Sequence, residues 1–368
     1  MEKLVKKIEQ KSEVCINVEL SGLGFEIYCQ KEIEKGLKAD LYQYIHPKQT
    51  VNTSEKKIKL YYVVSDGLFD EVMNNKSNKE GTRIQIFRSN MLNKHANRYD
   101  YGEYKLFYCD IEPYFLFTFE DKIYVLLRKD SKNIYRLYFR VMVEVTLRAK
   151  RYMGYHLIHA ACVCINDKAL LICGNKAAGK TTLMSHLLNS GKTNFISNDK
   201  VFLSADLSEI EYFPLVARIG GGTLNKFSKY DLRNEYYRIS KEDKKKGKED
   251  LGNDKWDFTP VEMAKIFNCE YKEAGKLEAV IIPNIGENNE EKITMVNEDV
   301  LNFDLYTDGC VTIENWLLND TLIDYFNSKK QDIDNVEKAT YEVYQVDYNY
   351  KSQSNRIMDK ISEKLWKN

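Results

Sequence analysis

The chain has 368 residues, with 55 Lys and Arg balanced by 55 Asp and Glu, so its formal net charge is zero. Balanced charge argues against general binding to nucleic acid or to anionic membranes. Glycine and proline number only 18 and 5, which excludes collagen-like and proline-rich chains. With 43% hydrophobic and 30% charged residues, the composition indicates a globular protein long enough for two domains.

Neither the N-terminus nor the cysteines indicate export. The first residues contain no apolar stretch typical of a signal peptide, and no segment approaches the ~20 apolar residues of a membrane span. The eight cysteines form no Cys-x-x-Cys pair, which argues against structural zinc and against a disulfide framework. We therefore expect a reduced, cytoplasmic protein that binds neither membranes nor nucleic acid.

The first third of the chain is predicted to be a strand-rich α+β domain covering residues 1–133. Alternating apolar residues around Ser21-Gly22 predict a hairpin over 14–28, and apolar spacing predicts a helix over 32–44. Further strands are expected at 57–64, 83–87, 104–109, 114–119 and 122–127. From its position alone, we expect this domain to recognise a substrate or to build a homo-oligomer.

The second domain is expected to cover residues 134–368 and to begin with a helix over 135–151. The runs 158–165 and 169–173 are almost continuously apolar, as in strands buried on both faces of a sheet. A glycine-rich loop, a helix over 181–188 and a strand over 194–203 follow, and a later strand over 279–282 is expected to end at Pro283. The charged stretch 240–253 is predicted to be a mobile, solvated loop, with a role as a lid or in substrate docking as the lesser alternative.

One motif dominates this half: Gly174-Asn175-Lys176-Ala177-Ala178-Gly179-Lys180-Thr181, followed by Thr182. It has the form Gly-x-x-x-x-Gly-Lys-[Ser/Thr], in which the glycines let backbone N–H groups face phosphate oxygens. The following helix directs its positive end toward the same anion. Lys180 is suited to the β and γ phosphates and the Thr181 hydroxyl to Mg²⁺. We expect residues 174–182 to bind ATP with Mg²⁺, with GTP an alternative because no base-reading motif is evident.

Five stretches accompany this loop in a fixed order. A strand containing His159 precedes it, a strand ending in Asn198-Asp199 follows its helix, and further stretches lie at 214–220, 259–263 and 277–283. Together, over about residues 150–290, they resemble the HPr kinase/phosphorylase family and its serine-kinase relatives, including those that tailor ribosomal peptides. The resemblance implies an α/β P-loop kinase domain of HPr-kinase (PEP-carboxykinase-like) type. It further implies Asp199 as the base and His159 as its assistant.

Chemical reasoning gives Asp199 a similar place. At the end of a strand expected beside the phosphate-loop strand, its carboxylate can reach the γ-phosphate, as a base or as a ligand of Mg²⁺, while Lys180 stabilises the transferred charge. Structural roles are the alternatives: a core histidine for His159, a strand-end cap for Asp199 and an ion pair for Arg218. Asn198, Arg218 and Lys255 are weaker candidates for contact with substrate or phosphate.

Two departures from the family pattern bear on activity. Asn198 stands where the family has an acidic residue, and Val216 stands where it has a glutamate that binds Mg²⁺. The leading hypothesis is an ATP- and Mg²⁺-dependent kinase that phosphorylates a Ser or Thr hydroxyl of a peptide or protein. A kinase for a small molecule such as free serine would use the same loop, and a nucleotide-binding regulatory module without turnover is the alternative from another class.

Overall fold

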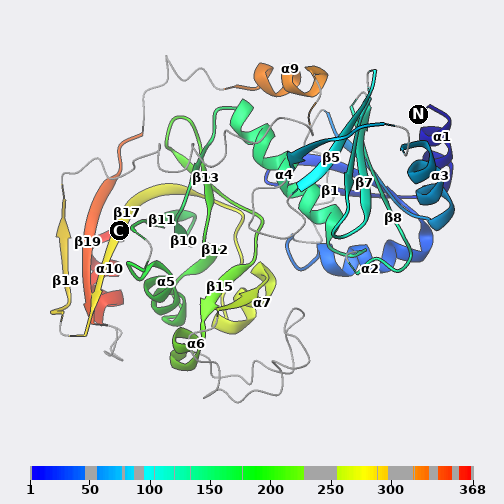
Figure 1. Cartoon of the computed structure of the whole chain (residues 1–368). Coiled ribbons are helices and arrows are strands. Elements are labelled where there is room, and N and C mark those ends of the chain that lie inside the picture. Colours follow the sequence, from blue (N-terminus) through cyan, green and yellow to red (C-terminus); the bar gives the residue numbers. More distant parts are fainter. Residues whose placement is uncertain are drawn as a thin grey trace. The chain divides into compact units, whose positions relative to one another are not determined.

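The computed structural model describes residues 2–45, 56–76, 79–86, 95–102, 104–119, 121–132, 134–175, 177–227, 255–287, 289–296, 318, 320–330, 339–349 and 356–365. Contacts divide the chain into unit 1, Met1–Met153 with Thr307–Gln331, and unit 2, Gly154–Tyr306 with Asp332–Asn368. Each unit combines helices with a sheet of mixed strand direction (Figure 1). The predicted loop at 240–253 lies outside the described residues.

Unit 1 is organised around an eight-stranded sheet with the order β1-β2-β3-β8-β7-β6-β5-β4. The pairs β2–β3 and β3–β8 are parallel and the other pairs are antiparallel. Its elements are α1 (Glu2–Lys11), β1 (Val14–Leu20), β2 (Leu23–Cys29), α2 (Lys31–Leu41), β3 (Ile58–Val64), α3 (Asp66–Lys76), β4 (Thr82–Gln85), β5 (His95–Tyr101), β6 (Tyr104–Cys109), β7 (Tyr114–Phe119), β8 (Lys122–Leu127), α4 (Leu137–Tyr152) and α9 (Asp320–Ser328).

The predicted hairpin is confirmed, and its turn explains its register. Ser21 and Gly22 both have positive φ, 48° and 73°, the backbone that a two-residue turn needs to match the twist of its strands. The predicted helix over 135–151 is present as α4. The expected domain boundary falls just before α4, which in the structure belongs to unit 1.

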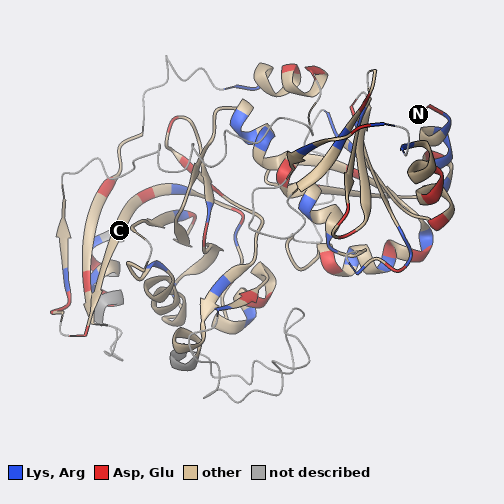
Figure 2. Ribbon diagram, viewed as in Figure 1, with Lys and Arg blue, Asp and Glu red and all other residues tan. Residues whose placement is uncertain are grey.

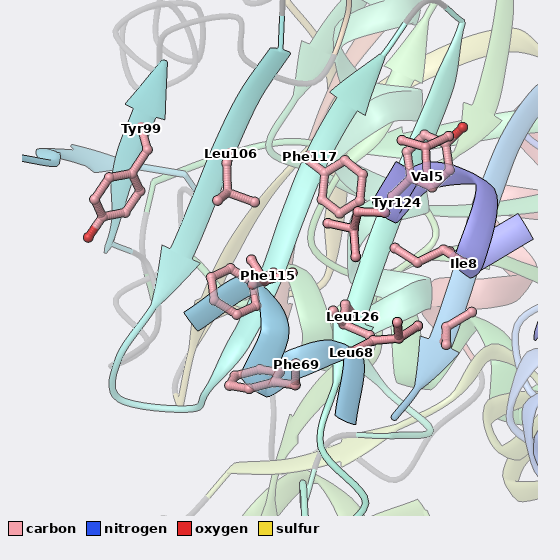
Figure 3. Packing of buried hydrophobic residues seen from close by; sticks show 13 residues of the cluster. Val5, Ile8, Leu68, Phe69, Tyr99, Leu106, Phe115, Phe117, Tyr124 and Leu126 are labelled. Carbon is pink, nitrogen blue, oxygen red and sulfur yellow. The ribbon is translucent and has the colours of Figure 1, made fainter. Parts of the chain in front are cut away.

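Helices cover both faces of this sheet. On one face α1 and α3 pack against the strands, as the close view of the cluster shows (Figure 3), with Val5 and Ile8 of α1 and Leu68 and Phe69 of α3 lying over β3 and β6 to β8. On the other face Tyr138 of α4 donates a hydrogen bond to the carbonyl oxygen of Leu37 in α2 (3.1 Å), and its ring packs edge-on against Tyr62 of β3. Charges of both signs occur along α1 and α2 (Figure 2), in line with the balanced composition.

Unit 2 contains a larger mixed sheet with the order β12-β10-β11-β17-β14-β13-β9, to which β19 adds beside β17 and β18 beside β19. A separate two-stranded sheet pairs β15 with β16. The elements are β9 (His156–Ile158), β10 (Ala161–Ile165), β11 (Lys168–Ile172), α5 (Lys180–Asn189), β12 (Asn194–Ser197), β13 (Val201–Leu203), β14 (Glu209–Tyr212), β15 (Ala217–Gly220), α6 (Gly221–Phe227), β16 (Lys255–Phe258), α7 (Pro260–Phe267), β17 (Ala274–Gly286), β18 (Lys292–Met295), β19 (Glu342–Asn349) and α10 (Arg356–Leu365).

Two strands predicted as continuous are each divided. The run 158–165 breaks between β9 and β10, and the run 194–203 breaks between β12 and β13. The breaks coincide in space because β10 pairs with β12 while β9 pairs with β13. The two chain segments therefore cross together from one side of the sheet, at β10 and β12, to the other side, at β9 and β13. His159 and Asp199 lie in the two connections, so this crossing positions the site.

The prediction that a strand ends at Pro283 is wrong, because β17 continues to Gly286. The amide N–H of Cys173 donates to the carbonyl oxygen of Ile281, so Ile281 faces β11. Backbone groups alternate along a strand, so Pro283 faces the same side two residues later, where β11 has already ended. A residue without an N–H loses no ladder bond there.

Among the described residues, no helix combines the length and apolar character needed to cross a bilayer.

Candidate functional site

The strand–loop–helix segment forms where the motif predicts it. The buried strand β11 leads into the loop, and α5 begins at Lys180. Gly179 has φ of +93°, and a Cβ atom there would lie 2.2 Å from Cδ1 of Ile285, so both backbone and space require glycine. Gly174 has φ of +145° and lies against Ala178. Lys176 of the motif lies outside the described residues.

Lys180 is held by the loop itself. Its Nζ donates hydrogen bonds to the carbonyl oxygens of Gly174 (2.7 Å) and Asn175 (3.1 Å), and the residue is buried. Burial lowers the pKa of Lys180, while the negative charge of Asp199 acts in the opposite direction. The lysine therefore lies across the loop with neutral partners, which an anionic oxygen can replace with a stronger, charge-assisted bond.

Three segments bring their chemistry to one edge of the sheet. Because β10 is antiparallel to both β11 and β12, these two strands run in the same direction and end at the same edge, where β10 begins. The loop after β11, Asp199 after β12 and His159 before β10 therefore meet there. The expectation that the strand of Asp199 lies directly beside the loop strand is wrong, since β10 separates them, but the shared direction still places both ends together.

His159 and Asp199 form a pair at this edge, with 3.3 Å between Nε2 and Oδ1, and their side chains are 28% and 40% exposed. Lys200 contributes a second cation, its Nζ lying 3.4 Å from Oδ2 of Asp199. Ser197 donates its hydroxyl to the carbonyl oxygen of Lys200 (2.5 Å), a bond that spans residues 198 and 199.

The hydrogen bond from His159 and the positive charge of Lys200 outweigh desolvation and lower the pKa of Asp199 to about 2. The carboxylate is therefore ionised throughout the neutral range. It is a weak proton acceptor, and its strength is to attract and orient positive charge and hydroxyl donors. Sequence reasoning missed Lys200, although its position next to Asp199 was a usable signal.

The three weaker candidates gather at the two-stranded β15–β16 sheet. Asn198 Nδ2 donates to the carbonyl oxygen of Arg218 on β15 (3.2 Å). Arg218 itself forms an ion pair with Asp257 of β16 (3.0 Å), in agreement with its structural alternative. Lys255, at the start of β16, is exposed, and its charge helps to lower the pKa of Lys180. Val216 lies just before β15 and offers no metal ligand.

The Thr181 hydroxyl and the Asp199 carboxylate are the oxygen donors that the sequence predicts for a metal. Within the described ranges, no group of three or more His, Cys, Asp and Glu residues is arranged to hold a metal ion by itself. This sparse donor set fits Mg²⁺, which takes one or two protein oxygens and completes its shell with substrate phosphates and water.

The loop helix is also supported from the C-terminal part of the chain, which sequence reasoning missed. Tyr348 of β19 is buried and forms a hydrogen bond with Nδ1 of His186 on α5 (2.7 Å). Its strand neighbour on β17 is Ile285, the residue that packs against Gly179. Because His186 and Tyr348 are 162 positions apart in the sequence, no local sequence pattern could have indicated this contact.

The sequence matches no protein-family model, and no curated protein matches it significantly. The second unit is therefore characterised by its own geometry. It is a mixed α/β unit in which a strand–loop–helix segment and a histidine–carboxylate pair lie at the same sheet edge.

Proposed function

We propose that the chain is an ATP- and Mg²⁺-dependent phosphotransferase of HPr-kinase-like (PEP-carboxykinase-like) type, which transfers the γ-phosphate to a Ser or Thr hydroxyl of a peptide or protein. The observation that carries the proposal is the position of the His159–Asp199 pair at the sheet edge where the 174–181 loop begins. Phosphoryl transfer needs phosphate binding and an oriented acceptor, and this edge offers groups for both.

The loop supplies the phosphate site. Its backbone N–H groups and the N-terminus of α5 favour an anion. Lys180, now bound to neutral carbonyl oxygens, gains a charged partner when a phosphate enters. Thr181 and Asp199 would hold Mg²⁺, which neutralises charge on the phosphates when it is bound.

The lowered pKa of Asp199 suits this carboxylate to orienting the acceptor hydroxyl rather than to acting as a strong base. A bond forms between the acceptor oxygen and the γ-phosphorus, the bond to the oxygen bridging the β and γ phosphates breaks, and ADP leaves. Because the transition state of phosphoryl transfer is loose, the hydroxyl proton leaves late and a strong base is not needed. A carboxylate with a pKa of about 2 can therefore align the hydroxyl and receive this proton late in the step. His159 and Lys200 then stabilise the ionised form that begins the next cycle.

One specific observation favours a second candidate, a nucleotide-binding regulatory module. Asn198 and Val216 leave this edge with fewer carboxylates than the family it resembles, so binding without turnover would need no further change. The two candidates differ in transfer, not in nucleotide binding, since both use Lys180.

The test combines γ-labelled ATP, Mg²⁺ and a size-fractionated extract of the source cells, with Asp199→Asn beside the wild type. The exposed Asp130, on a turn of unit 1, gives the matched control Asp130→Asn. Label in a peptide or protein fraction, present with wild type and control and lost with Asp199→Asn, supports the proposal. Label only among small molecules moves the substrate to a metabolite, and ATP binding without transfer favours the regulatory module.

A further inference from the structure

Asn198 is the buried polar residue of the sheet edge whose role the phosphate chemistry does not explain. It is 6% exposed and follows β12 directly. Its Nδ2 donates to the backbone carbonyl oxygen of Arg218 (3.2 Å). Its Oδ1 is buried and has no hydrogen-bond partner among the described residues. The structure therefore uses the donor half of this amide and not the acceptor half.

That hydrogen bond joins two separate sheets. Asn198 belongs to the corner of the large sheet, next to Asp199, whereas Arg218 belongs to the two-stranded sheet of β15 and β16. The two-stranded sheet carries Arg218, which is paired with Asp257, and Lys255, whose positive charge acts on Lys180. Because the acceptor is a backbone atom, the bond fixes the path of β15 itself.

We propose that Asn198 is a positioning residue: its amide holds the two-stranded β15–β16 sheet at a fixed place relative to Asp199 and the phosphate loop, and this role requires an amide at residue 198. A carboxylate has the same shape but no donor, so it would place two acceptor oxygens against the Arg218 carbonyl in a buried setting, next to the charge of Asp199. The departure from an acidic pair thus acquires a physical reason. The effect on transfer rests on the proposed function, whereas the link between the β15–β16 sheet and the large sheet does not.

Trp256 provides a direct reporter of the β15–β16 sheet. It lies on β16 opposite Ile219 of β15 and is 8% exposed. The other two tryptophans, Trp316 and Trp366, lie outside the described residues and are replaced by Phe in the full-length chain, so that fluorescence reports on Trp256 alone. In this background Asn198→Asp and Asn198→Ala are compared with the parent.

Asn194→Asp is the matched control on the same strand. Asn194 uses its Oδ1 to accept a hydrogen bond from the backbone N–H of Glu270 (3.0 Å), a bond that aspartate can still accept. Two measurements are made on each variant: quenching of Trp256 by acrylamide, and binding of a non-hydrolysable ATP analogue with Mg²⁺.

We expect both Asn198 variants to raise the quenching constant about threefold, because the Arg218 carbonyl oxygen loses its partner and the β15–β16 sheet loosens. Analogue affinity should fall by less than about threefold, because the loop is untouched, and the control should match the parent in both measurements. Unchanged quenching in Asn198→Ala overturns the proposal, and this variant decides the matter if Asn198→Asp does not fold.

Transfer separates this proposal from the proposed function. If the wild type phosphorylates an acceptor, Asn198→Ala should lower kcat about tenfold with little change in the KM for ATP, as misplacement of aligned groups does. If the Asn198 variants raise quenching but the wild type shows no transfer, the positioning role of Asn198 is supported and the proposed kinase function is refuted. If Asn198→Ala transfers phosphate at the wild-type rate and leaves quenching unchanged, the proposed kinase function is supported and the positioning role of Asn198 is refuted.

Discussion

The sheet of unit 1 and the sheet edge of unit 2 use their side chains in opposite ways. Across unit 1, neighbouring strands place four rings in register, Tyr28, Tyr61, Tyr124 and Phe117, stacked at 4.7, 5.0 and 4.8 Å between centroids. At the edge in unit 2, the segments 158–165 and 194–203 are each divided into two strands. Ionic groups gather where the segments divide, and Asp199 lies there 3.3 Å from His159 and 3.4 Å from Lys200.

The difference separates what stabilises the chain from what acts. Regular strands with buried rings contribute free energy of folding through burial and packing. Strand breaks and positive φ cost free energy, and they persist where the surrounding structure holds them in place. Changes in unit 1 should therefore affect stability and spare nucleotide binding, whereas changes at the edge in unit 2 should affect nucleotide binding or phosphoryl transfer more than stability.

The largest effect is expected from Phe117→Ala. Phe117 is fully buried and stacks on Tyr124, so truncation should reduce the free energy of unfolding of unit 1 by about 3–5 kcal/mol. Denaturant titration followed by tyrosine fluorescence measures this loss, and calorimetry with Mg·ATP under native conditions should give an unchanged affinity. Weaker ATP binding by the folded variant would contradict the separation.

Gly179→Ala should reverse this pattern. The new methyl group would collide with Ile285 at a residue with positive φ, so the loop or Ile285 must shift, and we expect ATP affinity to fall by about 100-fold or more with a smaller loss of stability. Gly191 also has positive φ, but a methyl group there would enter open space, so Gly191→Ala is the control for backbone strain alone. Equal ATP affinity in the two variants would mean that contact with Ile285 does not shape the loop.

Lys200→Met tests the electrostatics of the pair with a smaller change. Removing the cation that lies 3.4 Å from Asp199 should raise the pKa of that carboxyl toward its ordinary value, because His159 alone then opposes desolvation. The titration of Asp199, followed by NMR of its side-chain carboxyl carbon, measures the shift. A pKa that stays at about 2 would show that Lys200 contributes nothing.

The smallest effect concerns stability in acid. Since the pKa of Asp199 is lowered in the folded chain from the ordinary 3.8 to about 2, its ionised form stabilises the fold above about pH 4, and this contribution is lost as the pH falls toward 2. The difference in unfolding free energy between wild type and Asp199→Asn should therefore be constant above about pH 5 and change below about pH 4. A difference that is flat down to about pH 2 would contradict the lowered pKa.

Local patterns were sufficient where the chain is regular. Alternation and turn residues predicted the hairpin at Ser21-Gly22 and most strands of unit 1, and the glycine motif predicted where β11 gives way to α5. The first helix escaped notice because only three of its ten residues, Leu4, Val5 and Ile8, are buried.

The edge itself could be predicted only in part, because long-range pairing creates it. The apolar runs gave no sign that the strands would break at His159 and after Ser197. Each break lies where the segment changes its pairing partner, because β10 pairs with β12 whereas β9 pairs with β13. The contact of Asn198 with Arg218 likewise depends on a backbone carbonyl, which carries no sequence signal. Residue types indicated the chemistry, and the topology decided which of them meet.

Transfer of label from γ-labelled ATP tests the central claim most directly, that the pair beside the loop serves phosphoryl transfer. The wild type and Asp199→Asn are compared at equal occupancy by Mg·ATP, measured on the same samples. We predict that the wild type labels a peptide or protein acceptor, and that Asp199→Asn binds ATP within about threefold of the wild type but transfers at least about 100-fold more slowly. Equal transfer by both would contradict the role given to Asp199.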